Sequence, residues 1–244
     1  MCSKIVIAIC LLAATAGAWH PNLVAWYRAE NNALDASGNG HHGTWVGTEA
    51  YAPGVFAQGF AASSLSQWVS TPVDALFIEN TLVFTLSAWL YIPDIDGDFP
   101  PGQFRLFNSF GGASAQKGIA LQVDNRQSSD ITTRAIRLVV GQGTAGNYLL
   151  IVEGGLDSAT PGWTHYAAVG DGSVVRLYRN GSEIAHGEVS TPLPEGPSQH
   201  DLLLLSSTIA DAERYIDDLR IFNAALSPSD IKRVMLGLMP LGRY

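Results

Sequence analysis

Short stretches in which apolar and polar residues alternate recur along most of the chain. The clearest covers residues 84–92, where every second residue from Phe84 is apolar and the run stops at Pro93. Alternation over this length predicts a half-buried β-strand, and it ends at proline because proline has no amide hydrogen to donate to a sheet. Similar runs predict ten further strands, at residues 23–27, 104–110, 118–123, 135–140, 147–152, 164–169, 174–178, 183–186, 202–205 and 215–222.

Two local signals predict a hairpin and a helix. Asn180-Gly181 lies between two strand-like runs, and this dipeptide favours the type I′ turn, which needs positive φ at both central residues. Near the C-terminus, Ser227 can cap a helix, Pro228 suits its first position, and Asp230 lies three residues after the cap. The apolar residues that follow have helical spacing and predict a short C-terminal helix: Ile231, Val234, Met235 and Leu238.

No linker, long charge run or internal repeat divides the chain. About a dozen short strands in one unit predict two stacked antiparallel sheets. The fold class we expect is therefore all-β, a two-sheet antiparallel jelly-roll sandwich with a short C-terminal helix, formed as a single domain by residues 19–244.

Composition narrows the classes of partner. Of the 244 residues, 47% are hydrophobic and 15% charged, which is too apolar for a disordered chain. The 14 basic and 22 acidic side chains give a formal charge of −8. A nucleic-acid partner is therefore not expected, because binding to phosphates needs a cationic face.

The N-terminus has the pattern of a secretory signal peptide over residues 1–18. Lys4 precedes an apolar run over residues 5–14, and Ala16-Gly17-Ala18 fits the small-x-small cleavage pattern. The run is shorter than the ~20 residues of a transmembrane helix, and no other stretch of the sequence could span a membrane. The predicted location is secreted or at the extracellular surface; the alternative is that residues 1–18 are retained.

Five segments resemble, in order, motifs of the laminin-G-like members of the concanavalin A-like lectin/glucanase superfamily. They are LVAWY at 23–27 with the loop LDASGNGHHGT at 34–44, FTLSAWL at 84–90, WTHYA at 163–167, LYRNG at 177–181, and YIDDLRIF at 215–222 followed by ALS at 225–227 and Ile231. The resemblance implies a two-sheet jelly roll that is usually a recognition or adhesion module. It is also compatible with members that are enzymes.

Asp217 is the acidic residue that the strand pattern singles out. On an extended strand, Tyr215, Asp217, Leu219 and Ile221 share one face, which puts a carboxylate among apolar neighbours. Such a group must be paired, hydrogen-bonded or bound to a metal. Asp218, on the other face, is placed to pair with Arg220 or with solvent. In the alternative phase Ile216 and Phe222 point inward and Asp217 lies at the rim.

A calcium site follows from combining this strand with the Gly- and Asn-rich loop at 34–44. Calcium binds six to eight oxygen ligands from carboxylates, carbonyls and water. The resemblance implies that this loop meets the last strand and that many relatives hold a structural calcium ion there. The predicted ligands are Asp35 and Asp217, with Asn39 and His42 as weaker, mainly backbone-carbonyl ligands. The alternative is a hydrogen-bonded tight turn without an ion. The acidic run at 94–98 lacks the distal Glu of an EF-hand and is expected to be a solvated loop.

The sequence does not predict an enzyme. Glucanases of this fold carry Glu-x-Asp-x-x-Glu on one strand, and neither this motif nor a Gly-x-Ser-x-Gly elbow occurs. For sugar stacking, Trp45, Trp68 and Tyr148 lie in or near loops, whereas Trp26, Trp89 and Trp163 are expected inside.

The favoured function is an exported, non-catalytic recognition or adhesion module that binds glycan or protein and is stabilised by calcium. The alternative is a structural decoration or adhesion subunit of a larger assembly, such as a virion or cell surface layer, with a retained N-terminus.

Overall fold

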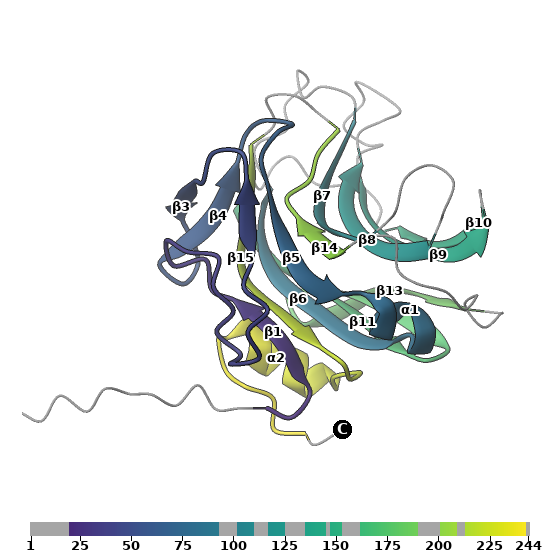
Figure 1. The fold of residues 1–244 in the computed structure, drawn as a ribbon. Coiled ribbons are helices and arrows are strands. Elements are labelled where there is room, and N and C mark those ends of the chain that lie inside the picture. The colour runs from purple at the N-terminus through teal and green to yellow at the C-terminus, as the bar shows by residue number, and fades with distance from the viewer. Residues whose placement is uncertain are drawn as a thin grey trace, which may run out of the picture.

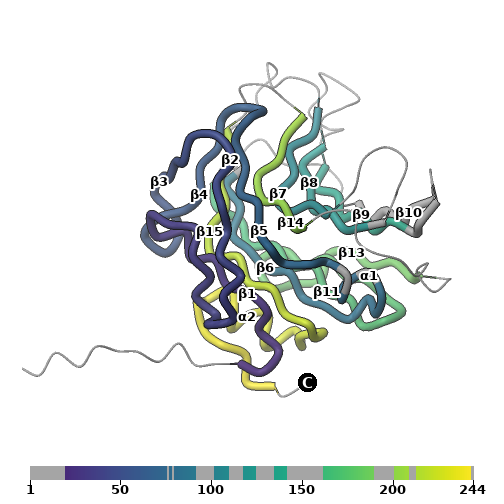
Figure 2. The backbone as a smooth tube through the Cα atoms, in the orientation of Figure 1, coloured from purple at the N-terminus to yellow at the C-terminus, as the bar shows by residue number. Residues whose placement is uncertain are grey.

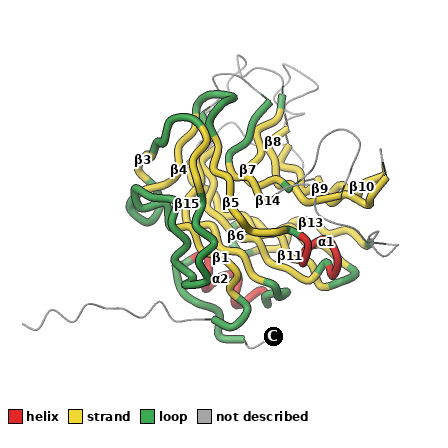
Figure 3. The backbone as a smooth tube through the Cα atoms, viewed as in Figure 1, coloured by secondary structure: helices red, strands yellow, loops and turns green. Residues whose placement is uncertain are grey.

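The computed structural model describes residues 20–92, 102–109, 117–124, 135–144, 147–152, 162–189, 201–208 and 213–242. It contains two antiparallel sheets that face each other, with a short helix near the C-terminus (Figures 1 and 3). The predicted all-β jelly-roll sandwich is thereby confirmed. The predicted signal peptide at 1–18 and the acidic run at 94–98 lie outside the described residues.

The larger sheet has eight strands, and we call it the large sheet. Its order is β13 (Ser182–Glu188), β12 (Val174–Arg179), β11 (Gly162–Asp171), β6 (Val83–Ile92), β15 (Arg214–Phe222), β4 (Gln58–Ala62) and β3 (Tyr51–Pro53), with β1 (Leu23–Tyr27) also paired to β15. The small sheet has the order β10 (Asn147–Val152), β9 (Ala135–Thr144), β8 (Lys117–Asp124), β7 (Gln103–Asn108), β14 (Asp201–Leu204), β5 (Trp68–Asp74) and β2 (Thr44–Val46). A one-and-a-half-turn helix, α1 (Leu76–Thr81), links β5 to β6.

The hydrophobic core lies between the two sheets. Phe84, Leu86, Ala88 and Leu90 of β6 are all buried in it, which confirms the face predicted from alternation. The residues between them, from Thr85 to Tyr91, therefore point away from the core. We call the side of the large sheet on which they lie its outer face.

The predicted hairpin and helix are both present. Asn180 and Gly181 have φ of +48° and +75°, the positive values that a type I′ turn requires. The helix α2 (Pro228–Met235) begins after Ser227, whose hydroxyl accepts a hydrogen bond from the Asp230 amide at 3.2 Å. Its buried apolar residues, Ile231 and Val234, pack on the outer face of the large sheet, in a cluster that includes Ala167, Tyr178 and Phe222.

A β-bulge in β15 changes the predicted phase of the last strand. Asp218 has φ of +50°, and the pairing with β6 slips between Asp217 and Arg220. Because the bulge adds one residue, Ile216 before it and Leu219 and Ile221 after it all reach the core. The prediction that Asp217 shares a face with Leu219 and Ile221 is therefore wrong.

The first loop and the last strand are neighbours, as the resemblance implied. Strand β1 pairs with β15, with Tyr27 opposite Leu219, and Tyr27 also forms an isolated bridge with Asp35. The tube view shows the loop that follows β1 lying beside β1 and β15 (Figure 2). Within the described part of the chain, none of the helices has the length and hydropathy required to cross a bilayer.

Candidate functional site

Three aromatic residues lie side by side on the outer face of the large sheet. Tyr91 of β6 is paired in register with Trp163 of β11 on one side and with Tyr215 of β15 on the other. The Tyr91 ring centroid is 5.7 Å from that of Trp163, with the planes at 71°, and 5.4 Å from that of Tyr215, with the planes at 90°. We call these three residues the aromatic rung.

The aromatic rung lines a shallow cavity of about 210 Å³, together with Ala52, Pro53 and Glu213. The three rings are half-buried, and Glu213 is exposed. The Tyr215 hydroxyl donates a hydrogen bond to Glu213 Oε2 at 2.7 Å. Burial, with this hydrogen bond, raises the pKa of Tyr215 to about 12, so the phenol stays neutral at physiological pH. We call this space the aromatic cavity.

A glycine allows Trp163 to lie close to the sheet. A Cβ atom at Gly59 of β4 would lie 3.1 Å from the end of the Trp163 indole and 3.0 Å from the Ile216 carbonyl oxygen. Either contact is tighter than most Cβ contacts in proteins, so a larger side chain would displace the indole or the strand. Gly59 thus helps to fix the position of one wall of the aromatic cavity.

Further along the same strands, the outer face is covered rather than open. Trp89 Nε1 donates to the Met235 carbonyl of α2 at 3.2 Å, and Arg220 Nη1 donates to the Leu238 carbonyl at 2.7 Å. His165 and Ser87 are buried beside them and share a hydrogen bond of 2.8 Å. Burial and the nearby Arg220 lower the pKa of His165 to about 3, so this imidazole is neutral. These groups are inaccessible to a substrate, so the Ser–His pair supports no nucleophilic chemistry.

Asp35 organises the loop that follows β1. Its carboxylate accepts four hydrogen bonds: from the amides of Trp26 (2.9 Å), Ser37 (2.8 Å) and His41 (3.0 Å), and from the Ser37 hydroxyl (2.8 Å). Burial alone would raise the pKa of Asp35, but the hydrogen bonds from Ser37, Trp26 and His41 outweigh it and lower the pKa below its ordinary value. A carboxylate has about four acceptor positions, and donors fill them here.

Asn39 and His42 belong to the same loop. Asn39 Nδ2 donates to the carbonyls of Leu23 at 2.7 Å and Val24 at 3.0 Å, and His42 Nδ1 accepts from the Asp35 amide at 3.1 Å. Three of the four predicted calcium ligands are thus brought together, fastened to β1 and to one another. Their hydrogen bonds favour the ion-free turn.

Asp217, the fourth predicted ligand, takes part in a different set of contacts. Its Oδ2 accepts from the amides of Val55 and Phe56, both at 2.8 Å, and its Oδ1 is buried without a hydrogen-bond partner. Burial is the main cause that raises the pKa of Asp217 to about 6. The acid connected to the Asp35 loop is instead Asp218, through Trp26, whose amide donates to Asp35 and whose Nε1 donates to Asp218.

The residues therefore do not fit calcium as arranged. Among the described residues, no group of three or more His, Cys, Asp or Glu side chains could hold a metal ion. The calcium site at Asp35, Asn39, His42 and Asp217 stays a prediction. As the sequence indicated, Asp218 pairs with Arg220, at 3.0 Å.

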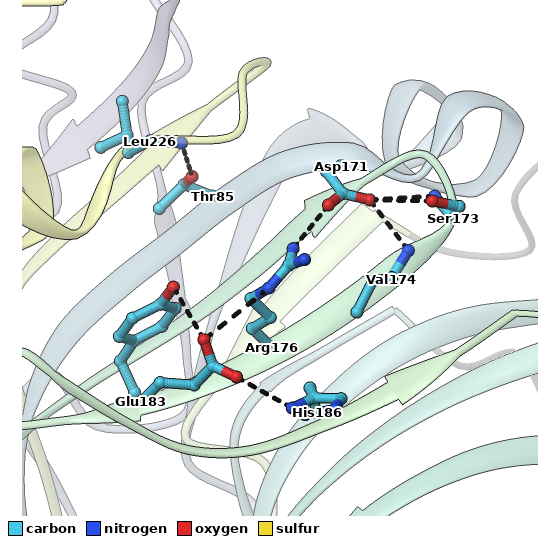
Figure 4. Close-up of polar contacts among 9 residues, drawn as sticks. Thr85, Asp171, Ser173, Val174, Arg176, Glu183, His186 and Leu226 are labelled. Carbon is cyan, nitrogen blue, oxygen red and sulfur yellow. Dashed lines mark hydrogen bonds and ion pairs between the residues drawn. The ribbon is translucent and has the colours of Figure 1, made fainter.

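A second polar cluster joins the end of β11 to the β12–β13 hairpin (Figure 4). Arg176 forms ion pairs with Asp171, at 2.5 Å, and with Glu183, at 3.7 Å. Glu183 Oε1 also lies 2.9 Å from His186 Nδ1. Strand β13 is an edge of the large sheet. Charged side chains on an edge strand discourage pairing with another chain, so this partly exposed network has a structural explanation.

Several aromatic side chains lie in environments that differ from those predicted from the sequence. Trp163, expected inside, lines the aromatic cavity. Trp45, a proposed stacking residue, packs edge-on against Tyr51 and Phe60. Trp68 is half-buried on β5, and the Tyr148 side chain is outside the described part. The alternation at 84–92 places Tyr91 outward, but nothing in the sequence aligns it with residues 163 and 215.

Comparison with known proteins gives a family and a set of similar folds. The sequence model of the concanavalin A-like lectin/glucanases superfamily, in its laminin-G form, matches residues 63–232. A search of curated proteins found no match.

Three of the most similar solved structures are botulinum neurotoxin domains. The receptor-binding domain of the C/D mosaic serotype has a TM-score of 0.70 and 17% identity, over 88% of this chain and 51% of that chain. A structure of neurotoxin type C, whose cell entry is described as dependent on interaction with two ganglioside molecules, has a TM-score of 0.69 and 16% identity, over 89% of this chain and 51% of that chain. The binding domain of neurotoxin DC in complex with rat synaptotagmin II has a TM-score of 0.67 and 15% identity, over 89% of this chain and 52% of that chain.

The chain spans about half the length of these neurotoxin domains, and at this identity the likeness concerns the fold alone. The family match covers most of the chain, including the strands that carry the aromatic rung. This protein belongs to the concanavalin A-like lectin/glucanases superfamily, as a laminin-G-like member.

Proposed function

We propose that this protein is an exported, non-catalytic recognition module that binds a glycan in the aromatic cavity. The observation that carries the proposal is the aromatic rung, three adjacent half-buried rings that line a cavity, whereas Trp89 and Arg220 on the same strands are covered by α2 and the segment that follows it. Aromatic faces stack on the apolar faces of sugars, and the Tyr215 and Glu213 oxygens can accept from sugar hydroxyls. The cavity, smaller than the roughly 300–1,000 Å³ of drug-sized sites, suits a group the size of one sugar ring.

The similar folds support recognition of a glycan or a protein. Gangliosides and synaptotagmin II are the ligands named for two of the neurotoxin structures. A fold by itself does not identify a ligand. The proposal therefore depends on the aromatic cavity, and binding to a protein in place of a glycan is one outcome of its test.

The acidic groups near the cavity support a non-catalytic role. Most glycosidases need two carboxyl groups that flank one bond. Among the described residues that line the aromatic cavity, Glu213 alone carries a carboxyl group. The nearby Asp217 is buried and binds the Val55 and Phe56 amides.

A matched pair of variants tests the binding site. The wild-type chain, Trp163→Ala and Trp68→Ala are applied to an array of oligosaccharides, and the best binders are titrated by calorimetry. Loss of a central aromatic anchor costs about 2 kcal/mol, or roughly 30-fold in affinity, so Trp163→Ala should lose binding and Trp68→Ala should keep it. Equal binding by Trp163→Ala and wild type, or loss with Trp68→Ala alone, would contradict the proposal.

Export has its own test. The proposal includes removal of residues 1–18, so the mass of the native protein should correspond to a chain that starts at Trp19. A mass that starts at Met1 would instead favour the alternative, an assembly subunit with a retained N-terminus.

A further inference from the structure

The aromatic cavity has one charged side chain among the described residues that line it, and that charge is negative. Glu213 is exposed at the cavity and lies directly before β15. The whole chain has a formal charge of −8, which is of the same sign as the charge of Glu213. An anionic group that enters the cavity meets a like charge.

The cation next to Glu213 in the sequence does not neutralise it. Arg214 is fully buried on the opposite side of β15 from Tyr215. Its guanidinium donates to the backbone carbonyls of Leu205 at 2.9 Å, Ser64 at 2.7 Å and Gln67 at 3.2 Å. Arg214 is thus held by backbone oxygens below the sheet surface, and the Glu213 charge remains exposed to a ligand.

The hydrogen bond between Tyr215 and Glu213 makes the polar edge of the cavity an acceptor. The phenolic proton is directed to Glu213 Oε2 at 2.7 Å, which leaves the Tyr215 oxygen to accept from a ligand. Burial raises the pKa of Tyr215 to about 12, so the phenol keeps this proton across the physiological range. Two neighbouring acceptors suit ligand groups that donate, namely hydroxyl and ammonium groups, and not carboxylate or sulfate groups.

We propose that the aromatic cavity selects neutral and ammonium-bearing sugars, that it excludes sialylated and sulfated ones, and that Glu213 determines this selectivity. The inference rests on the proposed function, since it names the class of glycan that the same cavity takes. The aromatic rung supplies the stacking surface for either class. Glu213 supplies the discrimination, because like charges brought together in an interface penalise the wrong partner.

The test uses pairs of glycans in which one member carries a charged group that the other lacks. Neutral oligosaccharides are compared with their sialylated and sulfated forms, and N-acetylglucosamine oligomers with glucosamine oligomers, on the array and by calorimetry. We expect the protein to bind each neutral oligosaccharide with an affinity at least about tenfold higher than that for its anionic form. The glucosamine oligomers should bind about two- to fivefold more tightly than the acetylated ones at low salt, and this advantage should fade at high salt.

Two isosteric variants assign the selectivity to one residue. Glu213→Gln should reduce the discrimination against anionic glycans to about threefold or less. Glu188→Gln, which removes the same charge from the exposed edge strand β13, should leave it unchanged. Both positions are exposed, and melting temperatures equal to that of wild type would show that both variants fold.

The outcomes separate the two proposals. If wild type binds the sialylated or sulfated forms as well as the neutral ones, or if Glu213→Gln leaves the discrimination unchanged, the selectivity inference is overturned while glycan binding stands. If no oligosaccharide of the array binds, the proposed function itself is overturned and the selectivity inference with it.

Discussion

The outer face of the large sheet has two regions that differ in what lies over them. In the covered region, Trp89 and Arg220 bond to carbonyls of α2 and of the segment that follows it. In the open region, the next residues along the same strands form the aromatic rung. Both regions place large side chains on β6 and its neighbours β11 and β15. The role of an aromatic residue here is set by what packs above the strand, not by the strand pattern.

The two regions also differ in how their polar groups are satisfied. In the covered region a buried charge needs a partner, and Asp218, Trp26 and Leu238 provide contacts to Arg220. In the open region the Tyr215–Glu213 pair remains accessible at the cavity. Substitutions in the covered region should therefore change stability, and substitutions in the open region should change binding.

The largest expected effect is in the covered region. Arg220 is 1% exposed, pairs with Asp218 at 3.0 Å, and stacks 4.4 Å from the Trp26 ring centroid. Arg220→Met leaves Asp218 buried without its cation and should lower the free energy of unfolding by about 3–5 kcal/mol in urea denaturation. Arg176→Met, which breaks the exposed network of Figure 4, is the control and should cost less than about 1 kcal/mol. Similar losses for the two variants would show that the covered region is not under the constraint described.

A second prediction concerns Asp217, next to the aromatic rung on β15. Its pKa is raised to about 6 by burial, so the folded protein holds this proton more tightly than the unfolded chain does. The contribution of this proton to the stability of the fold is complete below about pH 4, the pKa of an aspartate in the unfolded chain. It is lost as the pH rises through about 6. Asp217→Asn should remove this loss and gain about 3 kcal/mol relative to wild type between pH 4 and 7.5.

Asp35 is the control for this measurement, because its pKa is lowered and the sign reverses. Its contribution is present above the ordinary pKa of an aspartate and is lost as the pH falls through the folded value. Urea denaturation across the pH range should therefore show opposite trends for Asp217→Asn and Asp35→Asn, each relative to wild type. Parallel trends would refute the assignment of the buried acid to Asp217.

The smallest expected effect concerns the Asp35 loop, which Trp26 connects to the covered region. If a calcium ion bound Asp35, Asn39, His42 and Asp217, adding calcium to chelator-treated protein would raise the melting temperature by about 5 °C. Asp35→Asn would then abolish the rise. An unchanged melting temperature would refute the ion and support the turn in which four donors hold Asp35.

Sequence patterns were sufficient for the parts of the fold that local chemistry determines. The strand at 84–92 alternates cleanly, Asn180-Gly181 needs positive φ, and Ser227 caps α2. Strands β2 to β5 escaped prediction because they are short or contain Pro72 or Gly59, and tertiary pairing stabilises them. The bulge at Asp218 was missed because a non-glycine residue takes a positive φ there, with its carboxylate held by Arg220 and Trp26.

The candidate site could not be predicted because it is assembled by register. Tyr91, Trp163 and Tyr215 come from strands far apart in the sequence, and only the pairing of β6 with β11 and β15 aligns them. The Asp35 loop was found because its polar residues are contiguous. Its proposed partner Asp217 was misplaced because one extra residue in β15 shifts the phase of the strand.

Nuclear magnetic resonance of the tryptophan indoles tests the difference between the two regions most directly. The strongest-binding oligosaccharide of the array is titrated into uniformly ¹⁵N-labelled protein, and the indole N–H resonances of Trp163 and Trp89 are followed. We expect a saturable shift of the Trp163 resonance and no shift of the Trp89 resonance, because the Trp89 indole is bonded to the Met235 carbonyl beneath α2. A ligand that shifts the Trp89 resonance and leaves that of Trp163 unchanged would refute the division into an open and a covered region.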